Sequence, residues 1–395
     1  MRLVLLAKTV THGLARSAAH AVHALWTFPT MIAAAMLIAW GAECAQFVIS
    51  QGMALAILAW LQTLPEFAVE AVIAWNRDVP NLTANFTGAL RLLIGLGWPM
   101  IYATAAFFYR RRTGKPLRII ELDREHSVEV MALLPPLLYF IWIFYKATLT
   151  LVDSVVLTVL YVVYLGILNR IPSRDQEAIE DLEYVPRKVL ALGPRLRNAM
   201  IVAFFASGGA IIYLVAEPFV ESIKGLALAA GVSQFVFIQW IAPFVSEFPE
   251  KFSAFYWARK VTEAPMALMN MVSSNINQWT VLVAMIPMVY CWSSRAVVPI
   301  QFDHMHVVEI GLTIAQSALA FMLLLNMKFE WYEAAGLFVL WFIQFVLPGS
   351  REEMAFVYLG WVLIELVQQI AGRKAPAAFR EFRALFREHV RPRVG

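Results

Sequence analysis

The chain has 395 residues, of which 60% are hydrophobic and 15% charged, and its mean hydropathy is +0.65. So few polar residues cannot cover the surface of a soluble protein of this length, and the composition predicts a polytopic, all-helical membrane protein. The formal net charge of +4 comes mostly from loops and the C-terminal tail. It therefore bears on orientation in the bilayer and does not indicate a nucleic-acid partner.

The first 28 residues carry basic side chains and an apolar run that is too short for a signal peptide. We expect residues 1–28 to form an amphipathic helix on the membrane surface. An additional span that inverts this end of the chain is the alternative.

Apolar stretches of about 20 residues, each long enough to cross a bilayer, recur from residue 29 onward. We predict eleven spans, and counts of ten or twelve stay open. The predicted spans are 29–49, 52–75, 83–109, 127–146, 149–168, 198–217, 232–257, 266–292, 307–326, 331–348 and 353–371.

Basic residues cluster after the third and fifth spans and in the C-terminal tail. If the spans alternate in direction, all three clusters lie on one side, which the positive-inside rule assigns to the cytoplasm. We therefore expect an integral protein of the plasma (inner) membrane, with the N-terminus outside and the C-terminus cytoplasmic.

The dipeptide Pro-Glu occurs twice inside long apolar segments, with its glutamates at Glu66 and Glu250. A carboxylate near the centre of a membrane helix costs about 2.5–3.5 kcal/mol. The proline beside it breaks the helical hydrogen bonding and leaves carbonyl oxygens available. Paired defects of this kind in two halves of a chain are typical of a transporter whose ion site lies between repeats.

Other residues recur in the same order. Asn85 and Asn270 follow the two glutamates by nineteen and twenty residues, and Asp-x-x-His-x-x-Glu occurs at 123–129 and again 180 residues later. Each copy contains five predicted spans, and an odd number places the second copy in the opposite orientation.

The sequence thus predicts two inverted five-helix repeats with an extra C-terminal helix. The expected segments are 1–28 (N-terminal amphipathic segment), 29–168 (first repeat), 169–197 (cytoplasmic linker), 198–348 (second repeat) and 349–395 (extra helix and basic tail).

Side chains around the two breaks could bind a hard cation, which prefers carboxylate, amide, hydroxyl and carbonyl oxygens. Glu66 and Glu250 supply the charge, and Thr63, Gln62 and Ser246 can add neutral oxygens. The alternative is a pair of kinked helices whose glutamates bond to neighbouring backbone.

The third span of the second half contains a polar run from Asn270 to Gln278. Polar side chains at membrane depth must face protein or an aqueous cavity. We favour a role in the site over the alternative, which is polar contact between helices.

Each half therefore contains a small-polar-x-Pro-Glu segment followed by an Asn-x-x-small-Ser-Asn element, and this pattern resembles the alpha repeats of the cation/calcium exchanger superfamily. The resemblance covers roughly residues 29–348. It implies one cation pathway with the two glutamates at its centre. The metal-ion ligands that it nominates, together with their polar neighbours, are Glu66, Glu250, Thr63, Gln62, Ser246, Glu247, Ser274, Gln278, Asn85, Asn270 and Asn275.

The first repeat departs from the family pattern. Ala89 and Leu93 stand where the family has a serine and an amide ligand, and Arg91 adds a cation within the span. We expect Arg91 to pair with Glu66 or Glu70, or to extend away from the site. Fewer neutral ligands and more titratable ones favour proton coupling.

We interpret the Asp-x-x-His-x-x-Glu motifs as helix caps at span entrances, and Cys44 and Cys291 as buried small hydrophobes. The sequence shows no enzyme motif and implies no cofactor. The expected function is a secondary antiporter of calcium or another cation against sodium or protons, by alternating access, with inorganic cations, protons and the lipid bilayer as partners. The alternatives are a sodium/proton exchanger without calcium activity and a non-transporting membrane interaction protein. The ions and the oligomeric state stay open.

Overall fold

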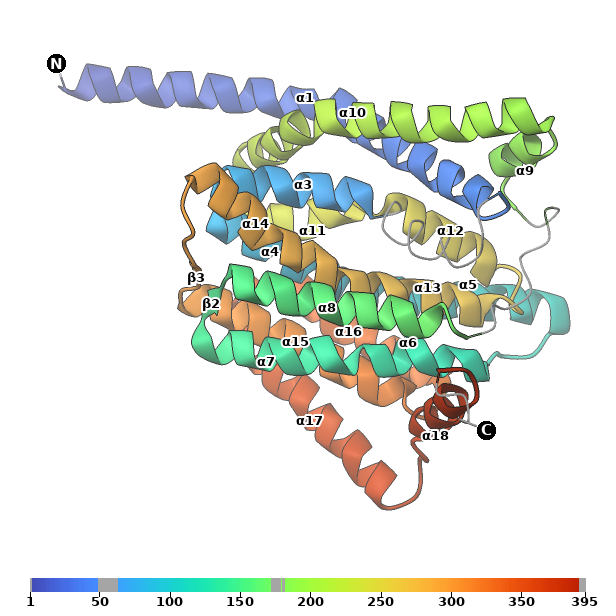
Figure 1. Cartoon of the computed structure of the whole chain (residues 1–395). Helices are drawn as coiled ribbons and strands as arrows, with labels where there is room; N and C mark the ends of the chain where they lie inside the picture. The colour runs from blue at the N-terminus through green and yellow to red at the C-terminus, as the bar shows by residue number, and fades with distance from the viewer. Residues whose placement is uncertain (1, 49–62, 172–178, 180–181, 391–395) are drawn as a thin grey trace.

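Helices account for nearly all the regular structure in a computed structural model that describes residues 2–48, 63–171, 179 and 182–390 (Figure 1). The part up to residue 171 contains α1 (Arg2–Ala45), α3 (Leu64–Trp75), α4 (Val79–Leu92), the π-helix η1 (Leu93–Gly97), α5 (Trp98–Thr113), β1 (Ile119–Glu121), η2 (Arg124–His126), α6 (Ser127–Ala132), α7 (Leu134–Lys146), β2 (Thr148–Leu149) and α8 (Leu151–Leu168). 

The remainder contains α9 (Tyr184–Leu190), α10 (Pro194–Ala229), α11 (Gln234–Ser246), α12 (Phe248–Ala258), α13 (Ala264–Asn277), the π-helix η4 (Gln278–Leu282), α14 (Val283–Ser294), β3 (Ile300–Gln301), α15 (His304–Leu324), β4 (Lys328–Glu330), α16 (Trp331–Val346), η5 (Pro348–Ser350), α17 (Arg351–Ile370), α18 (Ala377–Leu385) and η6 (Phe386–Val390). Helices α1 and α10 pack side by side along one edge of the molecule, and α17 and α18 lie at the opposite edge (Figure 1).

Seven helical stretches are long and apolar enough to cross a membrane, among the residues that the structure describes. These are His20–Ala45, Val79–Thr113, Arg124–Lys146, Leu151–Leu168, Pro194–Ala229, His304–Leu324 and Pro348–Ile370. Other predicted spans are divided or shorter: the span expected at 232–257 divides at Glu247 into α11 and α12, and α16 is a 16-residue helix.

The N-terminal end differs from the prediction in one respect. Helix α1 runs continuously through the expected boundary at residue 28, with Pro29 inside it. Residues 20–28 are therefore the beginning of the same helix as the first span, and no separate surface helix begins or ends there.

The order of elements repeats along the chain. The π-helices η1 and η4 begin 185 residues apart, at Leu93 and Gln278. Asp153 and Glu333, 180 residues apart, complete capping boxes at the starts of α8 and α16. These matched features use the two offsets found in the sequence, although the inverted orientation of the halves stays a prediction.

Two short strand pairs join the halves. Strand β1 pairs antiparallel with β4, with Ile119 opposite Glu330, and β2 pairs antiparallel with β3, with Thr148 opposite Gln301. Each pair combines one strand from before the linker with one from after it. The two halves are therefore tied together by backbone hydrogen bonds as well as by packing.

Both Pro-Glu segments lie at helix starts, for a local reason. Pro65 and Pro249 occupy the first turn of α3 and α12, where a missing N–H has no helical partner to lose. Since proline cannot continue a preceding helix, the chain breaks immediately before each glutamate. Glu66 and Glu250 thus sit in the first turn of a new helix, where the helix dipole favours negative charge.

Candidate functional site

Glu66 and Glu250 are almost completely buried, with 1% and 5% of their surface exposed. Both carboxylates accept hydrogen bonds from side chains of the polar stretch between α13 and η4. The Ser274 hydroxyl donates to Glu250 Oε2 at 2.9 Å, and the Gln278 amide donates to Glu66 Oε2 at 3.1 Å. This arrangement contradicts the alternative in which the glutamates only satisfy neighbouring backbone.

Gln278 is the residue that joins the two Pro-Glu segments. Its Nε2 also donates to Glu247 Oε1 at 2.8 Å, so both amide hydrogens are used on carboxylates from different halves of the chain. The side chain is 1% exposed. A single amide therefore fixes the positions of Glu66 and Glu247 relative to one another.

Glu247 has a second partner that was not predicted. Lys251, one helical turn later, forms a buried ion pair with Glu247 and donates a hydrogen bond to its Oε2. The ammonium group neutralises one carboxylate of the second half without involving Glu250. Its i,i+4 spacing from Glu247 is the sequence signal that could have revealed the pair.

Two further amides of α13 reach the first half. Asn277 donates to the Thr63 hydroxyl at 2.7 Å, and Asn275 donates to the Leu90 carbonyl at 3.3 Å. Asn277 lies in the predicted polar run but was not chosen as a ligand. These contacts bring α13 against the break before α3 and against α4.

Other predicted site residues lie apart from the two central glutamates. Asn85 donates to Glu70, one turn beyond Glu66, and not to Glu66 itself. The Ser246 hydroxyl donates to the Ala242 carbonyl of its own helix. Asn270 is half-buried, with no hydrogen bond to the described residues. Gln62 lies outside the described residues.

Several buried oxygens around the breaks accept no hydrogen bond from the part of the chain that the structure describes. Each belongs to a group that can only accept, and none can therefore be satisfied by turning a hydroxyl. They are Glu66 Oε1, Glu70 Oε1, Asn85 Oδ1, Asn275 Oδ1 and Gln278 Oε1. Because an unpartnered buried acceptor costs about 1–3 kcal/mol or more, such a concentration calls for donors or cations that the protein itself does not supply.

A cation at this position would need neutral as well as charged ligands. No group of three or more His, Cys, Asp or Glu side chains in the described residues could hold a metal ion on its own. The amide oxygens of Asn275 and Gln278 are therefore needed beside the carboxylates. Such an all-oxygen set suits a hard cation such as calcium or sodium.

Arg91 does not approach this site, which corrects the expected pairing with Glu66 or Glu70. It is 1% exposed and forms an ion pair with Glu309, while its Nη1 donates to Gln344 Oε1 at 3.0 Å. Periodicity could not reveal this partner because Glu309 is 218 residues away. Ala89 and Leu93 are fully buried apolar residues.

The Asp-x-x-His-x-x-Glu motifs include a helix cap, as expected. Asp303 accepts a hydrogen bond from the His306 backbone at 3.0 Å, and His306 Nδ1 accepts one from the Asp303 backbone at 3.2 Å. Glu309 is engaged by Arg91 and also by Arg351. The described structure therefore gives the second motif capping and ion-pairing roles.

Comparisons with known proteins agree with this architecture. The family model described as "Sodium/calcium exchanger protein" matches residues 15–169 and 200–348. The crystal structure of the H+/Ca2+ exchanger CAX has 30% identity and a TM-score of 0.85, over 94% of this chain and 92% of that chain. A comparison with curated proteins finds no match.

More distant structures share the fold. The sodium-calcium exchanger NCX_Mj has 18% identity and a TM-score of 0.53, over 85% of this chain and 99% of that chain. Native YfkE has 14% identity and a TM-score of 0.58, over 88% and 98%. These matches and the seven apolar helices show an integral membrane transporter. The chain belongs to the sodium/calcium exchanger protein family.

Proposed function

We propose that this protein is a secondary antiporter that exchanges calcium or another inorganic cation for protons or sodium, by alternating access around Glu66 and Glu250. The observation that carries the proposal is the set of buried oxygens without donors at the two Pro-Glu breaks. Carboxylate and amide oxygens in this combination match the ligands of a hard cation. Gln278 links the two halves of the site through its hydrogen bonds.

Charge balance favours protons as the exchanged ion. Glu66, Glu70, Glu247 and Glu250 are buried, and Lys251 forms its ion pair with Glu247. Isolated ionised carboxylates are too costly to bury, so each remaining one must be neutralised by a proton or by a bound cation. Competition between these two states couples cation binding to proton release. The 30% identical relative CAX is named an H+/Ca2+ exchanger, which supports this choice.

We further propose that residues 29–168 and 198–348 form the two inverted repeats of the transport unit. Residues 1–28, 169–197 and 349–395 are then the N-terminal segment, the cytoplasmic linker, and the extra helix with its basic tail. The C-terminus is cytoplasmic and the N-terminus external, in the plasma (inner) membrane. The partners are inorganic cations, protons and lipid, and the mechanism needs no cofactor.

Proteoliposomes with an imposed pH gradient provide the test. Wild-type protein should take up calcium when the lumen is acidic, with matching proton efflux. Glu250→Gln removes a central charge and should reduce uptake at least about 100-fold, the upper range for loss of a metal-orienting group. Glu353→Gln is the matched control, because Glu353 is exposed at the start of α17, and it should transport normally.

The same vesicles separate the alternatives. Proton flux driven by sodium, without calcium uptake, would indicate a sodium/proton exchanger. Equal background fluxes of calcium, sodium and protons in wild type and Glu250→Gln would refute transport and favour an interaction protein on an exchanger scaffold.

A further inference from the structure

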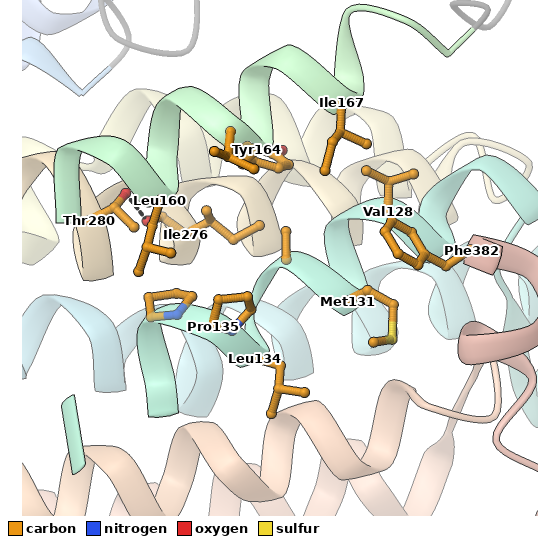
Figure 2. Close-up of a pocket in the computed structure, with 13 residues that line it drawn as sticks. Val128, Met131, Leu134, Pro135, Leu160, Tyr164, Ile167, Ile276, Thr280 and Phe382 are labelled. Carbon is orange, nitrogen blue, oxygen red and sulfur yellow. Dashed lines mark hydrogen bonds between the residues drawn. The ribbon is translucent and has the colours of Figure 1, made fainter. Parts of the chain in front are cut away.

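An apolar cavity of about 220 Å³ lies between α6, α7, α8 and the α13–η4 segment, away from the two glutamates (Figure 2). The Phe382 side chain, from the C-terminal helix α18, borders one end of it beside Val128. Two lining residues carry hydroxyls, and both are engaged. Thr280 donates to the Ile276 carbonyl, and Tyr164 bonds with Ser273 at 3.3 Å. A cavity without free polar side-chain partners does not hold water stably.

The cavity has a local cause in the sequence. Pro135 and Pro136 interrupt the helix between α6 and α7, because prolines lack the N–H that continues the helical ladder. The positions 180 residues later are Ala315 and Gln316, and there α15 is one uninterrupted helix.

The matching place in the other half is filled by the chain itself. Arg91 corresponds to Ile276 at the 185-residue offset, and Gln316 and Gln344 correspond to Pro136 and Tyr164 at the 180-residue offset. Arg91 Nη1 donates to Gln344 Oε1, and Gln316 Nε2 donates to the Arg91 carbonyl at 3.1 Å. Three equivalent positions thus form a packed polar cluster in one half. In the other half they line an empty apolar space.

This space borders a lipid-facing surface. Val163 lines the cavity and is 53% exposed on α8, a helix long and apolar enough to span the membrane. Acyl chains of the bilayer are therefore the apolar groups available at its edge.

The C-terminal end of the chain adds charge next to the cavity. Residues 373–390 contain five Lys or Arg residues and two Glu residues. Phe379, on the same helix as Phe382, is 46% exposed. An amphipathic basic helix with an exposed aromatic side chain suits a surface of anionic phospholipid.

We propose that an acyl chain of an anionic phospholipid occupies this cavity, with its headgroup held by the basic residues at α18. The occupant would contact Ile276 and Thr280, which lie in the same α13–η4 segment as Ser274 and Gln278. Lipid would then adjust the helix that holds the site glutamates. The binding itself does not depend on the proposed transport, whereas this regulatory consequence does.

The test uses full-length protein in liposomes that contain phosphatidylglycerol with a photoreactive diazirine on its acyl chain. Ile276 is 1% exposed, so a lipid tail labels it only from within the cavity. We expect irradiation followed by peptide mass spectrometry to find label on Ile276 and Met131. Label confined to exposed positions such as Val163 in wild-type protein would overturn the proposal.

Two variants and two lipids complete the design. Ala132→Phe fills the cavity and should lower Ile276 labelling at least about tenfold, since added side-chain volume excludes the tail. The control Val159→Phe, at a 53% exposed position on α8 outside the lining, should label as wild type does. Phosphatidylcholine and free fatty acid analogues should label Ile276 less than phosphatidylglycerol, and equal labelling by either would overturn the headgroup contact.

Discussion

Gln278 offers the sharpest test of the site geometry, because one side chain holds carboxylates from both halves. We consider Gln278→Met, which keeps an unbranched side chain of similar length but removes both amide hydrogens and the amide oxygen. Glu66 Oε2 and Glu247 Oε1 each lose a donor, at 3.1 and 2.8 Å. The unpartnered Gln278 Oε1, a candidate ligand, is lost as well.

The size of the effect follows from those contacts. A hydrogen bond to a charged group contributes about 1.5–3 kcal/mol, but part of that loss is recovered when a proton or cation neutralises the carboxylate. Loss of a group that orients metal ligands typically lowers affinity about 10–100-fold, which corresponds to about 1.4–2.7 kcal/mol. We therefore expect the KM for calcium to rise by about 10–100-fold, the range for such a loss.

The assay is calcium uptake into proteoliposomes across a range of calcium concentrations, under a fixed pH gradient. Gln368→Met, a glutamine on α17 that is half-buried, is the control and should keep the wild-type KM. A KM for Gln278→Met within about threefold of wild type, less than 1 kcal/mol, would refute the idea that this amide organises the cation ligands.

Two stability predictions concern other contacts. Arg91→Met leaves Glu309 without one of its buried partners and should lower the free energy of unfolding by about 3 kcal/mol, the lower end for breaking a buried ion pair. Thermal unfolding in detergent measures this, and an unchanged midpoint would contradict the role of the pair. Gly88→Ala should destabilise by about 1–3 kcal/mol, since an added Cβ would overlap the backbone of α11. Gly166→Ala, where the added atom meets open space, is its control and should unfold no more easily than wild type.

The sequence was sufficient to predict the membrane class, the exchanger family and the placement of Glu66 and Glu250. These features rest on local patterns: apolar length, a proline that must break a helix, and a carboxylate that is costly in an apolar span. The family and the fold are confirmed by the comparisons. The ligand set stays a prediction.

Partners between distant helices were the part that local patterns could not supply. Arg91 was expected near Glu66 or Glu70 and instead pairs with Glu309. A helical period tells which face a side chain occupies, but not which of several polar residues across the bundle lies opposite. Lys251 was overlooked for a different reason, because attention to oxygen ligands passed over a cation adjacent to Glu250.

The strand pairs between the halves also bear on how the chain folds during synthesis. Ile119 of β1 waits for Glu330 of β4, about 210 residues later, which takes roughly 10–40 s at 5–20 residues per second. During that interval the first half presents unpaired backbone groups, and its contacts with the second half cannot form. We therefore expect assembly to be late and dependent on contacts far apart in sequence, a topology that folds slowly. Two separately expressed halves would have to find these strand partners by diffusion in the bilayer.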